Sequence, residues 1–424
     1  QLYNNTSIPS CGFAKSFIGL EVRRPFDHLA SARNHQGRAH GNDKPGPVRW
    51  WERIITRGTG MTLKTRLISA AVMLAASTVL ASAQERVVNV YNWSDYIDES
   101  ILEDFTKETG IKVVYDVFDS NEVLETKLLA GSTGYDIVVP TGTFLARQIT
   151  AGVFQKLDKS KLPNLANMDP AISARLEKYD PGNEHAINYM WGTTGVGINV
   201  DKVKERLGDM PLNSWDIVFK PENIAKLADC GVYMLDTSEE IIPAALNYLG
   251  LDPDSNSPDD IAKAEELLLT IRPSVKKFHS SEYINALANG DICLAVGWSG
   301  DILQARDRAA EADQGVTIEY VIPKEGALMW FDNMAIPADA SHVEEAHEFL
   351  NYIMKPEAMA KASNYVYYAN GNAASKEFLN EDVIGDTAIY PDEETISRLY
   401  STSPKDQRTQ RVMTRTWTKV VTGQ

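Results

Sequence analysis

The chain has 424 residues, of which 43% are hydrophobic and 24% are charged, with 27 glycines, 19 prolines and 3 cysteines. This composition is typical of a globular protein and excludes collagen-like, disordered and small disulfide-rich classes. Residues 84–424 carry 54 acidic and 31 basic side chains, whereas residues 1–83 carry 4 acidic and 11 basic ones. The acidic main part of the chain argues against a nucleic-acid partner, because nucleic-acid binding depends on clustered basic charge.

Residues 61–83 have the pattern of a secretory signal peptide. A basic start precedes the apolar run 67–80, and an A-x-A cleavage site follows it. The run is shorter than the roughly 20 residues of a membrane-spanning helix, and a buried core helix would not need the basic start or the small-residue end. We therefore expect export, with cleavage near Ala83/Gln84. We interpret residues 1–60 as a disordered upstream extension that is not native to the protein.

Export affects the interpretation of the cysteines. Cys11 lies in the upstream extension, so the mature chain contains only Cys230 and Cys293. In an oxidising compartment these two residues form either a disulfide or two buried thiols. Without a nearby histidine they cannot form a four-ligand zinc site. Neither cysteine indicates catalysis, and we expect no cofactor and no metal.

Strands and helices are predicted to alternate along the mature chain. Apolar and β-branched runs predict strands over 87–91, 111–115, 135–139, 194–199, 232–235, 291–296, 318–322 and 335–336. Apolar residues at helical spacing predict helices over 97–109, 122–130, 221–229, 300–312 and 342–354, with another beginning near 200. Ser94 or Asp95 is the expected N-cap of the first helix. This alternation predicts an α/β protein with open parallel sheets.

Six segments at the expected strand ends, where open sheets bind ligands, combine aromatic residues, carboxylates and hydroxyls. They are 93–96 (WSDY), 140–143 (PTGT), 236–240 (DTSEE), 298–301 (WSGD), 330–332 (WFD) and 365–368 (YVYY). Each alone also fits core packing or a helix cap. Carboxylates bind an ammonium group through charge-assisted hydrogen bonds, and aromatic faces attract it and cover a methylene chain. Their repetition indicates a site for an elongated di- or polycation.

Longer stretches resemble the periplasmic putrescine/spermidine-binding proteins of polyamine ABC importers, over essentially all of 86–424. The stretches that carry the resemblance are VYNWSDYI, GYDIVVPTGTFLARQ, YMWGTTGVGINVDKV, HSSEYINALANGDICLAVGWSGD and IPKEGALMWFDNMAIP. The resemblance implies a type II two-lobed periplasmic binding protein of the α/β class, in which each lobe is an open mixed sheet flanked by helices and the ligand occupies the interlobe cleft. Lobe one is expected at 84–190 plus 325–372 and lobe two at 191–324, with a C-terminal helical segment, 373–424, packing on the lobes.

The same resemblance implies roles for single residues. The expected aromatic walls are Trp93, Tyr96, Trp298, Trp330 and Tyr368. The expected carboxylates are Glu240, Asp301 and Asp332, with Glu239 as the neighbour that could be confused with Glu240. The expected polar contacts are Ser94, Asp95 and Thr143. Cys230 and Cys293 match a cysteine pair of the family, which favours the disulfide. Relatives often carry Ser and Phe in place of Thr143 and Trp330, so the preferred polyamine stays open.

The function that the resemblance implies is periplasmic binding of a polyamine, putrescine or spermidine first, and its delivery to the permease subunits of an ABC importer. Lobe closure would achieve this without chemistry, and we expect a monomer. The alternatives are another cation, such as agmatine or cadaverine, and a receptor that signals to a membrane sensor. An enzyme is disfavoured, because 297–301 (GWSGD) departs from the G-x-S-x-G nucleophile elbow and no H-E-x-x-H motif occurs. We expect His342 and His347 on the surface.

Overall fold

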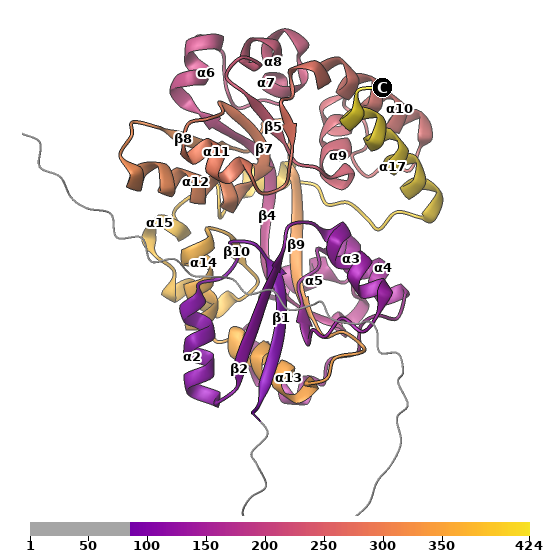
Figure 1. Cartoon of the computed structure of the whole chain (residues 1–424), viewed down its shortest axis with the longest axis vertical. Helices are drawn as coiled ribbons and strands as arrows, with labels where there is room; N and C mark the ends of the chain where they lie inside the picture. The colour runs from indigo at the N-terminus through magenta and orange to yellow at the C-terminus, as the bar shows by residue number, and fades with distance from the viewer. Residues whose placement is uncertain (1–84) are drawn as a thin grey trace, which may run out of the picture. The chain divides into compact units, whose positions relative to one another are not determined.

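The computed structural model describes residues 85–424, so the predicted signal peptide, the upstream extension and Cys11 lie outside the described residues (Figure 1). The strands are β1 (Val87–Trp93), β2 (Lys112–Phe118), β3 (Ile137–Val138), β4 (Ala186–Asn199), β5 (Val232–Met234), β6 (Lys277–Phe278), β7 (Leu294–Trp298), β8 (Ile318–Val321), β9 (Leu328–Ala335) and β10 (Ala369–Asn370). The α-helices are α2 (Glu99–Thr109), α3 (Asn121–Ala130), α4 (Gly142–Thr150), α5 (Pro170–Leu176), α6 (Val200–Leu207), α7 (Asp216–Phe219), α8 (Pro221–Leu227), α9 (Ser238–Tyr248), α10 (Pro258–Ile271), α11 (Tyr283–Ala288), α12 (Ser299–Ala312), α13 (Val343–Ile353), α14 (Pro356–Val366), α15 (Glu381–Ile384), α16 (Glu393–Arg398) and α17 (Gln407–Thr422).

The strands form one mixed sheet in the order β2-β1-β3-β9-β4-β7-β5-β6, with β8 and β10 also paired to β4. At one end β1 pairs in parallel with β2 and β3, and at the other β5 pairs in parallel with β6 and β7. The central strands β4 and β9 are antiparallel to each other and to their outer neighbours. The predicted α/β class with a mixed sheet is confirmed.

Two large apolar cores lie on either side of these central strands. One contains β1, β3, α2 and α13, and the other contains β5, β7, α9 and α10. Strand β4 contributes Tyr189 and Met190 to the first core and Val196 and Ile198 to the second. In Figure 1, β4 and β9 are the elements that run from one group of helices to the other. The two cores therefore share their central strands, and any motion between them bends β4 and β9.

The central strands are longer than predicted, since only 194–199 of β4 and the end of β9 were expected. Both strands are buried along their whole length. A strand buried on both faces lacks the alternation of apolar and polar residues that marks a half-buried strand. Because polar residues interrupt the apolar runs of β4 and β9, the full lengths of these two strands could not be recognised in the sequence.

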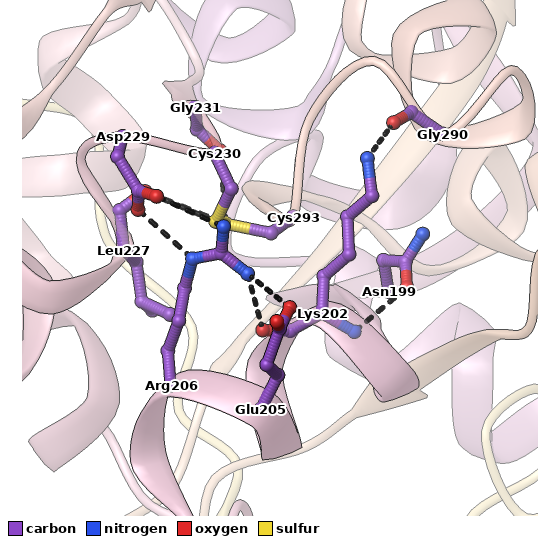
Figure 2. Close-up of a disulfide and its surroundings, with 10 residues drawn as sticks. All are labelled: Asn199, Lys202, Glu205, Arg206, Leu227, Asp229, Cys230, Gly231, Gly290 and Cys293. Carbon is purple, nitrogen blue, oxygen red and sulfur yellow. Dashed lines mark hydrogen bonds and ion pairs between the residues drawn. A yellow bond between two sulfur atoms is a disulfide. The ribbon is translucent and has the colours of Figure 1, made fainter.

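The disulfide between Cys230 and Cys293 is present, as the family resemblance favoured (Figure 2). It joins the turn after α8 to the residue before β7, with 5.6 Å between the two Cα atoms. Beside it, Arg206 of α6 forms an ion pair with Asp229 at 2.9 Å. The covalent link therefore ties a helix to the central part of the second core.

Two local predictions are wrong. The N-cap of α2 is Asp98, whose carboxylate accepts a hydrogen bond from the Ser100 N–H at 2.9 Å, because the chain first makes a turn in which Asp95 has a left-handed φ of 54°. His347 is 3% exposed instead of lying on the surface. Its ring accepts a hydrogen bond from the Asp158 N–H at 2.9 Å, so it supports a loop.

Within 85–424, no helix is long and apolar enough to cross a membrane.

Candidate functional site

One cavity brings together ten of the eleven predicted site residues. These are Trp93, Ser94, Tyr96, Thr143, Glu240, Trp298, Asp301, Trp330, Asp332 and Tyr368. They come from both sides of the central strands: Trp93 ends β1 beside the first core, whereas Glu240 lies in the first turn of α9 beside the second. The cavity is therefore a cleft between the two lobes.

The Asp332 carboxylate is the first of three buried acidic groups in the cleft. Asp332 lies in β9 and is 5% exposed. One carboxylate oxygen accepts a hydrogen bond from the Thr141 hydroxyl at 2.6 Å, and the other accepts one from the Tyr96 hydroxyl at 2.8 Å. Burial raises the pKa of Asp332 to about 7, although both hydroxyl donors oppose the rise.

The Asp301 carboxylate is held in the same way. Asp301 lies in the first turn of α12 and is 8% exposed. Its two oxygens accept hydrogen bonds from the Tyr283 and Tyr368 hydroxyls, each at 2.7 Å. Burial raises the pKa of Asp301 to about 6, again against the effect of its two donors.

The third buried acid is Glu240, which is 9% exposed. The Thr194 hydroxyl of β4 donates a hydrogen bond to its carboxylate. Burial raises the pKa of Glu240 to about 7, and the neighbouring charge of Asp332 adds to the rise. Three carboxyl groups thus share one desolvated cleft.

These three groups have no ion-pair partner in the described part of the chain. Within 85–424, no lysine, arginine or histidine forms an ion pair with Glu240, Asp301 or Asp332. A buried charge is costly unless an opposite charge and hydrogen bonds compensate it. The cleft is therefore electrostatically complementary to a ligand with more than one positive charge. In the same residues no group of acidic, His or Cys side chains has the arrangement of a metal site.

Aromatic rings surround the acidic groups. Trp93 and Trp298 meet edge to face across the cleft, with ring centroids 5.7 Å apart. Tyr368 contacts both Tyr96 and Trp330 edge to face, at 5.3 and 5.2 Å. Ring faces attract ammonium groups, and their flat apolar surface covers methylene groups. The walls thus suit the carbon chain of an alkyl cation, and the carboxylates suit its ends.

The structure separates Glu239 from Glu240, which the sequence could not do. The Glu239 carboxylate forms an ion pair with Arg147 at 2.6 Å and accepts a hydrogen bond from the Thr143 hydroxyl at 2.8 Å. Both residues line the cleft, but the charge of Glu239 is already compensated. Glu240 is therefore the carboxylate that is available to a ligand, and the Thr143 hydroxyl is directed to Glu239.

Asp95 is the one predicted site residue that does not line the cavity. Its carboxylate is largely exposed and forms an ion pair with Arg308 of α12 at 2.8 Å. Asp95 has a left-handed φ of 54°, and its side chain pairs with Arg308 whereas Ser94 lines the cavity. Sequence reasoning missed Thr141 and Tyr283, which hold the two aspartates. Thr141 lies inside the predicted segment 140–143, from which Thr143 was chosen instead, and Tyr283 lies in the stretch HSSEYINALANGDICLAVGWSGD. No spacing rule marks either hydroxyl.

The expectation that every site segment follows a strand is wrong for two of them. Trp330 and Asp332 lie within β9, not after a strand. Alternate residues of a strand point to the same face, so both side chains reach the cleft. Tyr368 follows α14, not a strand. The crossover strand thus supplies ligand-facing residues from its middle.

Comparison with known proteins places the chain in a family. The family model described as bacterial extracellular solute-binding protein matches residues 100–390. The chain is 57% identical to the putrescine-binding periplasmic protein SpuD of Pseudomonas aeruginosa, over 83% of this chain and 97% of that protein. It is 52% identical to the putrescine-binding periplasmic protein PotF of Escherichia coli, over 84% and 96% of the two chains.

A solved structure agrees with these sequence relatives. The spermidine/putrescine ABC transporter substrate-binding protein PotD of Streptococcus pneumoniae superposes with a TM-score of 0.66 at 30% identity, covering 80% of this chain and 99% of that chain. These relatives are periplasmic putrescine-binding proteins and an ABC transporter substrate-binding protein. The chain belongs to the bacterial extracellular solute-binding proteins, among the periplasmic putrescine- and spermidine-binding proteins.

Proposed function

We propose that this protein binds a linear polyamine in the periplasm and delivers it to the permease subunits of an ABC importer. The observation that carries the proposal is the set of three buried carboxyl groups, Glu240, Asp301 and Asp332, in an aromatic-walled cleft, none of them paired with a cation of residues 85–424. The names of the relatives make putrescine the first candidate and spermidine the second.

Polyamine binding follows from the physical chemistry of the cleft. An ammonium group donates up to three hydrogen bonds and carries a compact charge, so it suits carboxylates whose other positions are already filled by hydroxyl donors. The methylene chain between two ammonium groups leaves water when it packs against the rings of Trp93, Trp298 and Trp330, which contributes about 0.8 kcal/mol for each buried CH₂. A ligand with a single ammonium group would leave more of the three buried carboxyl groups without a partner than a diamine would.

Lobe closure is the proposed means of capture. Trp93 and Glu240 belong to different lobes and face the same cleft, so a ligand that contacts both binds the closed arrangement more tightly than an open one. Such differential binding shifts the population towards the closed form. We place lobe one at 84–190 plus 325–372 and lobe two at 191–324. The two apolar cores support these limits, and α17, within the segment 373–424, packs on the second core.

We propose that binding proceeds without chemistry. Ser299, at the centre of the GWSGD segment, accepts a hydrogen bond from a backbone N–H of β4 at 3.4 Å, and no histidine contacts its hydroxyl within 85–424. The carboxyl groups of the cleft are held by hydroxyl donors instead of facing a positioned nucleophile. A polyamine incubated with the protein should therefore be recovered unchanged by mass spectrometry.

Isothermal titration of ligand-free protein beginning near Gln84 tests the proposal. Putrescine, spermidine, spermine, cadaverine and agmatine are the ligands, after removal of any co-purified ligand by unfolding and refolding. We expect one-to-one binding of at least one of them at micromolar affinity or tighter, and the rank order identifies the preferred ligand. Failure of all five to bind a correctly refolded protein would overturn the polyamine assignment.

A further inference from the structure

The segment 297–301 (GWSGD) contains two glycines that the backbone conformation does not require. Neither Gly297 nor Gly300 has a positive φ, so another residue could adopt the same backbone angles. Space is the constraint instead. A Cβ atom on Gly297 would lie 2.6 Å from the Tyr283 ring, and one on Gly300 would lie 2.5 Å from the Tyr368 ring. The lack of a Cβ atom at each glycine therefore leaves room for one tyrosine ring.

Tyr283 and Tyr368 both donate hydrogen bonds to the Asp301 carboxylate. The Tyr283 hydroxyl donates to one Asp301 carboxylate oxygen and the Tyr368 hydroxyl to the other, both at 2.7 Å. Each hydroxyl also accepts a backbone hydrogen bond from the same segment, from the Trp298 N–H at 3.2 Å and from the Asp301 N–H at 3.1 Å. Each oxygen of the Asp301 carboxylate thus has its own tyrosine donor, and each tyrosine ring packs against its own glycine.

We propose that Tyr283 and Tyr368 form a tyrosine clamp, in which Tyr283 is a positioning residue that keeps Asp301 ionised and aimed into the cleft. The clamp rests on the proposed function, in which Asp301 meets an ammonium group. Tyr283 is fully buried and does not line the cleft, so it acts on a ligand only through Asp301 and Trp298. Tyr368 both lines the cleft and holds the carboxylate.

Burial and the charged groups around Asp301 determine the rise in its pKa that the clamp must oppose. Burial raises the Asp301 pKa, and the Asp95 carboxylate adds to the rise, whereas Arg308 lowers it. Asp332 lines the same cleft, and the charge of Asp301 adds to the rise in the Asp332 pKa. The two tyrosine hydroxyls stabilise the ionised form against these effects, because a donor favours the charged state of its acceptor.

Tyr283→Phe removes one donor and keeps the ring. In the ligand-free protein, the pH midpoint of Asp301 should rise by about one unit, and polyamine affinity should then weaken by up to about tenfold at acidic pH, with a smaller loss near pH 8. Carbon-13 NMR of labelled aspartate carboxyl groups, assigned with Asp301→Asn, measures the midpoint without any ligand. Titration calorimetry from about pH 6 to pH 8 measures the affinity ratio.

Tyr189→Phe is the matched control, because it removes a buried tyrosine hydroxyl whose acceptor is the backbone carbonyl of Tyr96. Its Asp301 midpoint should equal that of the wild type. Gly297→Ala displaces the Tyr283 ring without removing its hydroxyl, and should raise the midpoint as Tyr283→Phe does. This variant decides the question if Tyr283→Phe does not fold.

The outcomes separate the clamp from the proposed function. An Asp301 midpoint that is the same in wild type, Tyr283→Phe and Gly297→Ala would overturn the clamp, even if the wild type binds polyamines. A raised midpoint in both variants supports the clamp. A raised midpoint together with no polyamine binding by the wild type would overturn the proposed ligand, because the carboxylate would then be prepared for another cation.

Discussion

Binding of a polyamine to this protein should release protons, and the number follows from the three buried carboxyl groups. Their pKa values are about 7 for Glu240, about 6 for Asp301 and about 7 for Asp332. At pH 7 the three groups together hold roughly one proton in the ligand-free cleft, at pH 6 roughly two, and at pH 8.5 almost none. An ammonium group lowers the pKa of every carboxylate that it contacts, so a dication whose two ammonium groups together contact all three carboxylates expels these protons.

Titration calorimetry of putrescine in buffers of different ionisation enthalpy measures the release directly. The apparent binding enthalpy at one pH should vary linearly with the buffer enthalpy, and the slope gives about one proton at pH 7 and about two at pH 6. The affinity should accordingly rise as pH increases from 6 to 8. A slope of zero at both pH 6 and pH 7 would refute the reasoning, because the carboxyl groups would then be ionised before the ligand arrives.

The same three carboxyl groups determine whether the stability of the ligand-free protein rises or falls with pH. A carboxyl pKa that is higher in the folded than in the unfolded state means that the folded protein binds more protons between about pH 4 and pH 7. The stability contributed by these protons is complete below the unfolded pKa and is lost as pH rises through the folded values. The melting temperature without ligand should therefore fall from pH 5 to pH 8, and saturating ligand should remove the fall. A ligand-free melting temperature that rises over this range would contradict the account.

Three substitutions give further tests. Asp301→Ala should weaken polyamine binding in calorimetry by more than Trp330→Phe, because it leaves an ammonium group without its charged partner in a desolvated cleft, and equal losses would contradict the assignment. Replacing Cys230 and Cys293 together by Ala should lower the unfolding free energy by about 2–5 kcal/mol in urea titration, and an unchanged midpoint would show that the disulfide does not stabilise the fold. Asp95→Ala should change affinity by less than Asp301→Ala, since Asp95 lies outside the cavity, and an equal loss would place Asp95 in the site.

The alternation of strands and helices could be predicted from the sequence because most elements are short and have clear signals. The β-branched run at the start of β1 and the glycine at the end of α2 mark those elements locally. The lengths of β4 and β9 could not be predicted, because their polar residues face other buried groups instead of solvent. In β4, for example, the Thr194 hydroxyl meets Glu240, which is distant in the sequence.

Most residues of the candidate site could be predicted from their residue types and from the family resemblance. The predicted carboxylates and rings, eight residues in all, line one cavity together with Ser94 and Thr143. The exception is Asp95, which has a left-handed φ and pairs with Arg308 outside the cavity. Thr141 and Tyr283 were missed, since their role is to hold Asp332 and Asp301 and becomes visible only when distant segments come together.

A crystal structure of the protein with putrescine bound would show directly which side chains hold the ligand. We expect ligand nitrogens within hydrogen-bonding distance of the Asp301, Asp332 and Glu240 carboxylates, with the methylene chain packed against the rings of Trp93 and Trp298. A ligand whose nitrogens contact Glu239 or Asp95 instead, or that lies outside the cleft, would contradict this expectation.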